Sequence, residues 1–234
     1  GASALNHYID REVDAALGRT QLRSLPSGRI RRPRRVLFLG LGLVVLSIPF
    51  ALSLNPWVAL FTLSGAFVYV VVYTWWLKPR TSRNVVVGGL AGSCAVIAGW
   101  FAASPHITPA LLVLALLVFL WTPAHFWSFA LVHQDDYRRA GVPMLPVVAG
   151  ERKTGRQILL YTALVVATSL LLYLISPMGS LYLVGALLLG SLFLRVNFAL
   201  WRSPVVERAW SSYKSSGAYL LLLLLLMAGD VALG

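Results

Sequence analysis

Cysteine and charged residues, acidic ones above all, are scarce in this sequence. Their scarcity excludes an internal disulfide and an ordinary soluble domain. A single cysteine, Cys94, means that no disulfide can form within the 234-residue chain. Only 12% of the residues are charged whereas 58% are hydrophobic, a composition that excludes an ordinary soluble domain. Eight residues are Asp or Glu, and five of them gather in two short clusters, Asp10–Asp14 and Asp135–Asp136. Two such clusters in a chain so short of carboxylates indicate a site for a divalent cation and an anion.

The hydrophobic residues form seven long runs, each close to the roughly 20 residues that cross a hydrocarbon core of about 30 Å. In lipid the backbone has to satisfy its own hydrogen bonds, so runs of this length are predicted to be helices. A soluble helical protein would instead show polar stripes at a period of 3.6 residues, which these runs lack. The prediction is an all-α membrane bundle. Its predicted spans are Val36–Leu54, Trp57–Leu77, Val85–Ala103, Pro109–Val132, Ile158–Ile175, Leu181–Leu200 and Ala218–Leu233.

The start of the chain also bears on domain organisation. A stretch of small residues, Gly1–Leu5, is typical of the end of a helix, and no initiator methionine precedes it. No internal repeat or low-complexity linker divides the rest of the sequence. We therefore expect one domain over residues 1–234, truncated at its N-terminus.

Basic residues divide the connections between the apolar runs into two classes. All 20 Lys and Arg residues lie before the first predicted span, in alternate connections, or at the end of the sixth span. The intervening turns, Ser53–Pro56, Ser104–Thr108 and Ser176–Ser180, carry none. The positive-inside rule places the basic connections and both acidic clusters on the cytoplasmic side. The membrane is predicted to be a bacterial cell membrane. The net charge of +12 therefore indicates topology and an anionic substrate, and we expect no nucleic-acid partner.

The first acidic cluster has the spacing of a metal site on a helix. Asn6, Asp10 and Asp14 are four residues apart, which places them on one helical face at about 6 Å per step. Like charges at that spacing repel each other, so something must offset them. Mg²⁺ prefers oxygen and typically uses one or two protein carboxylates with substrate phosphates, and Asn6 offers a further oxygen or a hydrogen bond. The alternative is a solvated helix end in which Arg11 pairs with Asp14.

A basic segment with proline and glycine follows this cluster. Arg19, Arg23 and Arg29 lie close to the carboxylates in sequence, and guanidinium groups bind phosphate oxygens bidentately. These three arginines are therefore predicted to contact phosphate, and ordinary cytoplasmic charge is the alternative. Membrane topology alone explains Arg31–Arg35.

The second acidic cluster ends an aromatic-rich span in which Pro123 is expected to kink or break the helix. An imidazole at membrane depth needs a partner, so His125 either bonds to a neighbouring helix or takes part in function. Trp127 and Phe129 fit an interfacial aromatic belt, or alternatively a surface that binds a flat ring or a cation.

These motifs resemble the UbiA superfamily of intramembrane prenyltransferases, and in detail its haem O synthase branch. The Asn-x-x-x-Asp-x-x-x-Asp helix end and the second Asp-bearing loop carry the likeness to the superfamily. The Asp135-Asp136-Tyr137 sequence, with Arg139 where the superfamily usually has another Asp, favours the haem O synthase branch. The matching segments are Gly1–Ile30, Tyr73–Gly89 and Trp121–Tyr161.

The resemblance implies a bundle of nine spans, about seven of which are present, and a Mg²⁺-dependent enzyme. It implies transfer of a farnesyl group from farnesyl diphosphate to a vinyl group of haem B, giving haem O, with a haem A synthase acting downstream. The implied catalytic residues are Asp10, Asp14 and Asp135, and the implied metal ligands are Asn6, Asp10, Asp14, Asp135 and Asp136. The implied diphosphate-binding residues are Arg19, Arg23, Arg29, Lys78 and Arg80, and the implied haem-contacting residues are His125, Trp127 and Phe129.

Three other functions are compatible with the same residues. A UbiA-type enzyme acting on an aromatic or quinone precursor would share the metal chemistry. A transporter would need polar groups near mid-membrane, which are scarce here. A structural or assembly subunit would not need Asp10 or Asp14.

Overall fold

The computed structural model describes residues 1–233, and every regular element within that range is a helix. The chain divides into two compact units, one of residues Gly1–His106 and His133–Val148, the other of Ile107–Val132 and Ala149 onward. The first unit holds α1 (Ala2–Ile9), α2 (Arg11–Ala16), α3 (Pro33–Leu54), α4 (Pro56–Phe67), η1 (Val68–Leu77), α5 (Asn84–Gly88), α6 (Leu90–Ala103), α8 (Gln134–Arg139) and nearly all of α9 (Leu145–Ala149). The second holds α7 (Pro109–Val132), α10 (Glu151–Ile175), α11 (Ser180–Arg202) and α12 (Val206–Leu233).

Seven helical segments are long and apolar enough to cross a membrane, which confirms the predicted all-α membrane fold. They are Pro33–Leu54, Pro56–Leu77, Asn84–Ala103, Pro109–Val132, Glu151–Ile175, Ser180–Arg202 and Val206–Leu233. Two begin more than one helical turn earlier than predicted, at Glu151 instead of Ile158 and at Val206 instead of Ala218. In both, polar residues extend the helix beyond the apolar run, and hydropathy marks only the apolar part. Pro123 lies inside α7 without ending it.

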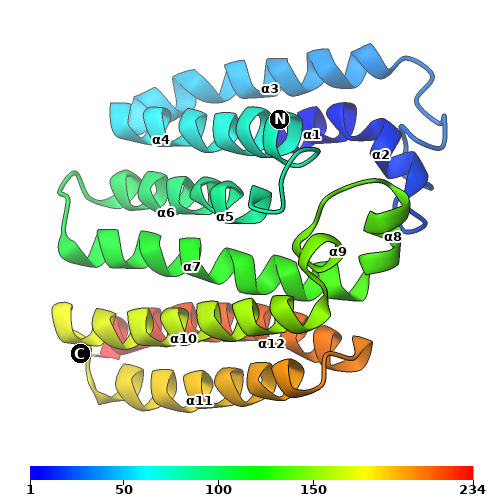
Figure 1. Cartoon of the computed structure of the whole chain (residues 1–234). Helices are drawn as coiled ribbons and strands as arrows, with labels where there is room; N and C mark the ends of the chain where they lie inside the picture. Colours follow the sequence, from blue (N-terminus) through cyan, green and yellow to red (C-terminus); the bar gives the residue numbers. More distant parts are fainter. Residues whose placement is uncertain (234) are drawn as a thin grey trace. The chain divides into compact units, whose positions relative to one another are not determined.

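In the first unit, α1 packs against α3 and η1, and α4 packs against α3 and α6 (Figure 1). The approach of α1 to α3 is close because Gly40 lacks a side chain: a Cβ there would lie 2.8 Å from the Leu5 side chain. Leu5 and Asn6 are the buried residues of α1. This packing fixes the short helix and therefore the residues that follow it, including Asp10.

The second membrane span changes from α to π geometry at Val68. The amide of Lys78 accordingly donates to the carbonyl of Tyr73, five residues earlier, at 2.8 Å. Nine of the ten residues of η1 are β-branched or aromatic, types that lose side-chain freedom in an ordinary α-helix. The π-helix is rare and occurs mostly as single-turn bulges, which are frequent at functional sites.

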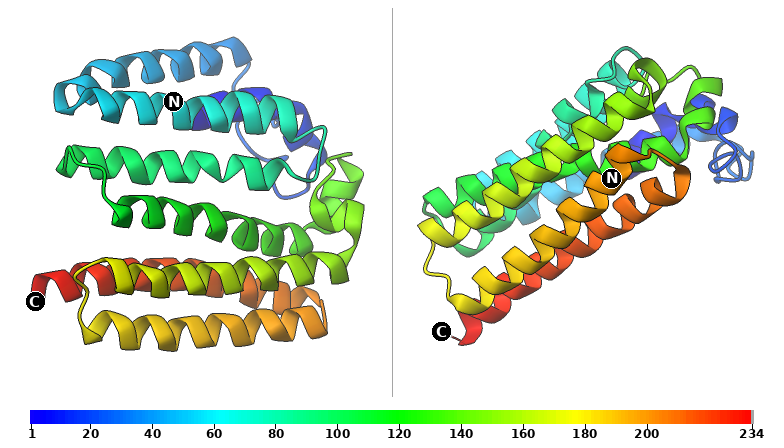
Figure 2. Two further views of the ribbon diagram at one scale, coloured as in Figure 1. Left: turned by 60° about the vertical axis from the view of Figure 1, so that its left-hand side comes forward. Right: turned by 60° about the horizontal axis from the view of Figure 1, so that its bottom comes forward.

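The second unit is a four-helix bundle in which α7, α10, α11 and α12 each pack on two of the others (Figure 2). Its core includes the fully buried Tyr182 and Phe193 and the almost fully buried Tyr219. Both tyrosine hydroxyls find acceptors on one residue: Tyr182 donates to the Ser169 carbonyl at 2.9 Å, and Tyr219 donates to its hydroxyl at 3.0 Å. Their burial therefore leaves no phenolic group without a partner.

A carboxylate from α12 caps the start of α11. The two Asp230 oxygens accept from the amides of Gly179 and Tyr182 at 2.5 and 3.0 Å. The first amides of a helix lack partners within it, and a negative charge beside them also favours the helix dipole. Asp230 is therefore assigned a structural role.

Candidate active site

Two buried carboxylates form the centre of the candidate site in the first unit. Asp10 and Asp14 are 5% and 3% exposed. Although α1 ends at Ile9 and α2 starts at Arg11, the backbone bonds continue through the junction, from Asp10 to Asn6 at 2.8 Å and from Asp14 to Asp10 at 2.7 Å. The three residues of the predicted helical face thus keep their four-residue spacing.

Each buried carboxylate has its own basic partner. The Lys78 ammonium group forms an ion pair with Asp10, and the Arg23 guanidinium group pairs with Asp14 at 2.9 Å. The Lys78 side chain is itself only 12% exposed, so its pair with Asp10 is largely withdrawn from solvent. Burying a charge without a partner costs several kcal/mol, on the order of the whole stability of a small domain. These bases therefore offset the like charges that the sequence places side by side.

Asn6 is oriented by a short chain of hydrogen bonds. Its Nδ2 group donates to Asp10 at 2.9 Å and to the Thr74 hydroxyl at 3.0 Å. The Thr74 hydroxyl in turn donates to the Tyr69 carbonyl at 2.8 Å. A carbonyl only accepts, so the Thr74 oxygen has to accept from Asn6, which fixes the amide orientation. Of the two roles expected for Asn6, the structure favours hydrogen bonding to Asp10, with Oδ1 as its remaining acceptor.

The π-helix η1 supplies Thr74 to this site, and Lys78 is the residue directly after its end. The two residues are one four-residue step apart and contact Asn6 and Asp10, respectively. The buried Asn84 of α5 donates to the Lys78 carbonyl at 3.4 Å. Thr74 was not among the residues predicted from the sequence, although it lies in the segment that resembles the family.

The second acidic cluster separates its two carboxylates. The Asp135 side chain is 82% exposed and pairs with Arg138 at 2.5 Å. The Asp136 side chain is 16% exposed, pairs with Arg139 at 2.6 Å and lies 3.7 Å from His133. Asp136 is thus the more buried of the two carboxylates, and the catalytic and metal-binding role of Asp135 stays a prediction.

Tyr137 links this second cluster to the first. It is 5% exposed, and its hydroxyl accepts from Arg19 at 3.0 Å. Burial raises the pKa of Tyr137, Arg19 opposes that shift, and the charges of Asp10 and Asp14 add to it. These charge effects place Tyr137 within electrostatic range of both carboxylates. It was missed as a site residue, although it directly follows Asp136 in the sequence.

His133 lies at the break between α7 and α8. Burial lowers the pKa of His133, Arg19 lowers it further, and Asp136 partly opposes both effects. His133 is therefore mainly neutral near pH 7.

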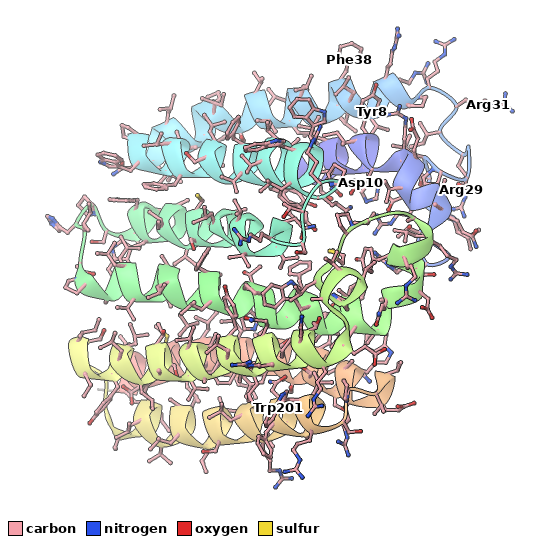
Figure 3. The ribbon with its side chains drawn as sticks, viewed as in Figure 1. Tyr8, Asp10, Arg29, Arg31, Phe38 and Trp201 are labelled. Carbon is pink, nitrogen blue, oxygen red and sulfur yellow. The ribbon has the colours of Figure 1, made fainter. Side chains whose placement is uncertain are left out.

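Two predicted diphosphate ligands are not part of this cluster. Arg29 is exposed on the loop between α2 and α3, whereas Asp10 lies at the α1–α2 junction (Figure 3). Arg80 is exposed and donates to the carbonyls of Trp75 and Trp76 at 3.1 and 2.7 Å, which caps the end of η1. Arg80 thus satisfies backbone groups that the end of the helix leaves unpaired.

The set of oxygen donors decides whether Mg²⁺ fits. Among residues 1–233, no three His, Cys, Asp or Glu side chains come together as a metal site, so the five-residue ligand set expected from the sequence is not gathered. Mg²⁺ commonly uses only one or two protein carboxylates and completes its shell with substrate phosphates and water. Asp10 and Asp14 fit that smaller requirement.

The predicted haem-contacting residues lie on α7 in the second unit. His125 bonds to Ser216 of α12 at 2.6 Å. Trp127 is 3% exposed and packs edge-on to Tyr161, and its indole N–H has no hydrogen-bond partner among the described residues. Phe129 contacts the Tyr213 ring at 5.2 Å. Nothing in the sequence pattern pointed to Ser216.

Comparison with known proteins matches this chain to one protein family. The model of the UbiA prenyltransferase family matches residues 1–226. The chain is 44% identical to a protoheme IX farnesyltransferase of Roseiflexus castenholzii over 99% of the chain and 43% of that protein. It is 42% identical to the Desulforudis audaxviator protein of the same name, over 99% of the chain and 73% of that protein. The chain thus spans about two fifths of the longer relatives.

Solved structures agree on the fold. A structure of digeranylgeranylglyceryl phosphate synthase superposes with a TM-score of 0.79 at 20% identity, covering 98% of this chain and 80% of that one. An Archaeoglobus fulgidus UbiA homologue bound to GPP and Mg²⁺ gives a TM-score of 0.66 at 16% identity, covering 97% and 82%. The family match over nearly the whole length, the shared helical fold and the buried carboxylates lead to one conclusion: the chain belongs to the UbiA prenyltransferase family.

Proposed function

We propose that this chain transfers a farnesyl group from farnesyl diphosphate to a vinyl group of haem B, giving haem O. The observation that carries the proposal is the pair of contacts Lys78–Asp10 and Arg23–Asp14 in the first unit. A site for a metal diphosphate needs carboxylates for the metal and cations for the phosphate oxygens, and these four side chains supply both. The protoheme IX farnesyltransferases that the chain resembles support haem as the acceptor.

The proposed reaction breaks the bond between C1 of the farnesyl group and the diphosphate oxygen. The vinyl π electrons form the new carbon–carbon bond to C1. Water then adds to the porphyrin-side carbon and loses a proton, so that the products are a hydroxyethylfarnesyl porphyrin, diphosphate and a proton. A cavity that excludes water until the carbon–carbon bond has formed prevents hydrolysis of the allylic cation.

Asp10 and Asp14 are the proposed ligands of Mg²⁺, which would act as a Lewis acid on the departing diphosphate. Support comes from the UbiA homologue of similar fold that holds GPP and Mg²⁺. Lys78, Arg23 and Arg19 would donate charge-assisted hydrogen bonds to the diphosphate oxygens. Lys78 and Arg23 would exchange part of their present bonding to the carboxylates for bonding to the substrate.

His125, Trp127 and Phe129 are the proposed acceptor-contacting residues of the second unit. We infer one prenyltransferase domain over residues 1–234, because a single family model matches residues 1–226. The distribution of basic residues supports a cytoplasmic position for the carboxylates in a bacterial cell membrane. A haem A synthase would then use the product.

Haem O formation is the direct test. Haem B, farnesyl diphosphate and Mg²⁺ would be added to membranes containing the chain, and the haem products would be identified by mass spectrometry. Parallel reactions would replace haem B with an aromatic acid or a quinone precursor, and Asp10→Asn membranes would serve as the inactive control. Haem O in the first reaction alone supports the proposal. A prenylated aromatic acceptor with no haem O would overturn it in favour of another UbiA-type activity.

A further inference from the structure

The imidazole of His125 is held rigidly within the second unit. One face stacks on Trp121 and the other on Tyr213, each with ring centroids 4.4 Å apart. The Trp121 indole N–H donates to the Ser216 carbonyl at 2.8 Å, so the stacking partner is itself fixed. With both faces covered, the ring can interact with a further group only through its edge.

The hydrogen bonds of Ser216 define which imidazole nitrogen carries the proton. The Ser216 hydroxyl donates to the Tyr213 carbonyl at 2.7 Å and lies 2.6 Å from His125 Nδ1. A hydroxyl has one hydrogen, and a carbonyl can only accept, so the Ser216 oxygen must accept from Nδ1–H. The neutral ring then carries its lone pair on Nε2.

That lone pair is left without a partner. Among residues 1–233, His125 Nε2 has no hydrogen-bond partner, and the side chain is only partly buried. An unpaired imidazole nitrogen in a membrane-spanning helix is unfavourable, because lipid cannot satisfy it. Histidines that bind metals usually donate their other N–H to a fixed acceptor, which sets the tautomer and orients the ring. Ser216 stands in that relation to His125.

We propose that His125 presents Nε2 as an axial ligand to the iron of a porphyrin, and that Ser216 is the positioning residue that fixes its tautomer. The ligand class follows from the atom offered: neutral imidazole nitrogen is a common ligand of haem iron. This inference rests on the proposed function for its choice of haem over another metal complex, and it names the contact through which the acceptor would be held.

Spectroscopic titration of the purified full chain in detergent tests the contact without relying on turnover. Ferric haem and metal-free protoporphyrin would be added to the parent chain, to His125→Gly and to Ser216→Ala, with exposed His106→Gln as the matched control. We expect an absorption spectrum typical of imidazole-ligated haem in the parent and the control. It should be lost in His125→Gly and restored by added imidazole. Ser216→Ala should weaken haem binding about tenfold and leave protoporphyrin binding unchanged.

The outcomes separate this inference from the proposed function. If His125→Gly binds haem with the parental spectrum, or if haem and protoporphyrin bind equally well, the axial contact is wrong. Haem O formation with that spectral result would leave the proposed function standing. Imidazole-type ligation at His125 without farnesyl transfer would support the contact and overturn the proposed function.

Discussion

Lys78 and Asp10 are 68 positions apart in the sequence and form a buried ion pair in the folded chain. One comes from the residue after η1, the other from the junction between α1 and α2. A positive and a negative group are thus held together where neither could be buried alone. The same arrangement makes the site sensitive to the loss of either charge.

Asp10→Asn or Asp14→Asn should lower the rate of haem O formation by at least about a hundredfold. Loss of a metal ligand removes several kcal/mol of transition-state stabilisation, and a hundredfold corresponds to about 2.7 kcal/mol. Product formed by each variant in membranes provides the measurement. Glu12→Gln, at an exposed position paired with Arg11, is the matched control. Normal turnover in both aspartate variants would contradict the assignment of Asp10 and Asp14 as Mg²⁺ ligands.

Thr74→Val should lower kcat about tenfold, whereas Thr74→Ser should keep most of the activity. Valine has nearly the same shape but cannot accept from Asn6, so the amide loses the contact that orients it towards Asp10. The loss of one such bond costs roughly 1.4 kcal/mol, equivalent to a factor of ten. Steady-state rates at saturating haem would reveal the change. Equal rates for the valine and serine variants would argue against an orienting role.

His133 should make the protein less stable in acid. Its folded-state pKa lies below the ordinary 6.5, so below that pH the unfolded chain binds a proton that the folded chain resists. Stability therefore falls as pH drops through 6.5, and His133→Gln should lessen the loss between about pH 7 and about pH 5. Thermal unfolding in detergent at both pH values measures this, with His106→Gln as the control. An undiminished loss in His133→Gln would contradict it.

Asp230→Ala should destabilise the second unit by about 1–2 kcal/mol, the usual cost of losing a helix cap. Its carboxylate is 7% exposed and accepts two amides at the start of α11, which alanine would leave unpaired. Asp230→Asn keeps one acceptor and should lose less. Denaturant unfolding would rank the variants, with exposed Glu207→Gln as reference. A stability equal to that of the reference would show that water replaces the cap.

Membrane topology can be tested by labelling single cysteines in a Cys94→Ala background. A cysteine at Ser27 should react only from the cytoplasmic side, and one at Ser104 only from the opposite side, because basic residues surround the first and not the second. The membrane-impermeant reagent would be added to intact cells and to inverted vesicles. Reversed or mixed labelling would contradict the prediction that the basic connections and both acidic clusters lie on the cytoplasmic side.

The sequence predicted most accurately what depends on short periods and on hydropathy. The membrane helices follow from apolar length, and the shared face of Asn6, Asp10 and Asp14 follows from a spacing of four. The contrast between Asp135 and Asp136 could not be predicted, because adjacent helical residues point about 100° apart. Which one is buried depends on how α8 is turned after the break at His133.

Contacts between elements that are far apart in the sequence also could not be predicted from it. Ser216 lies 91 positions from His125, and no pattern in α12 distinguishes it from the neighbouring serines. The family resemblance implied Arg80 as a diphosphate ligand. The structure turns it back onto the carbonyls at the end of η1 instead.

The π geometry of η1 determines the direction in which the side chains at its C-terminal end point around the helix axis. Thr74 and Lys78 contact Asn6 and Asp10 from the end of this segment, whose wider turns differ from those of an α-helix of the same length. A change of one residue in helix length turns the following side chains by about 100°. Deleting a single valine far from the carboxylates would thus misdirect Lys78 without altering any residue that touches it. In this span the number of residues matters as much as their identity, so chain length is itself a functional property of the segment.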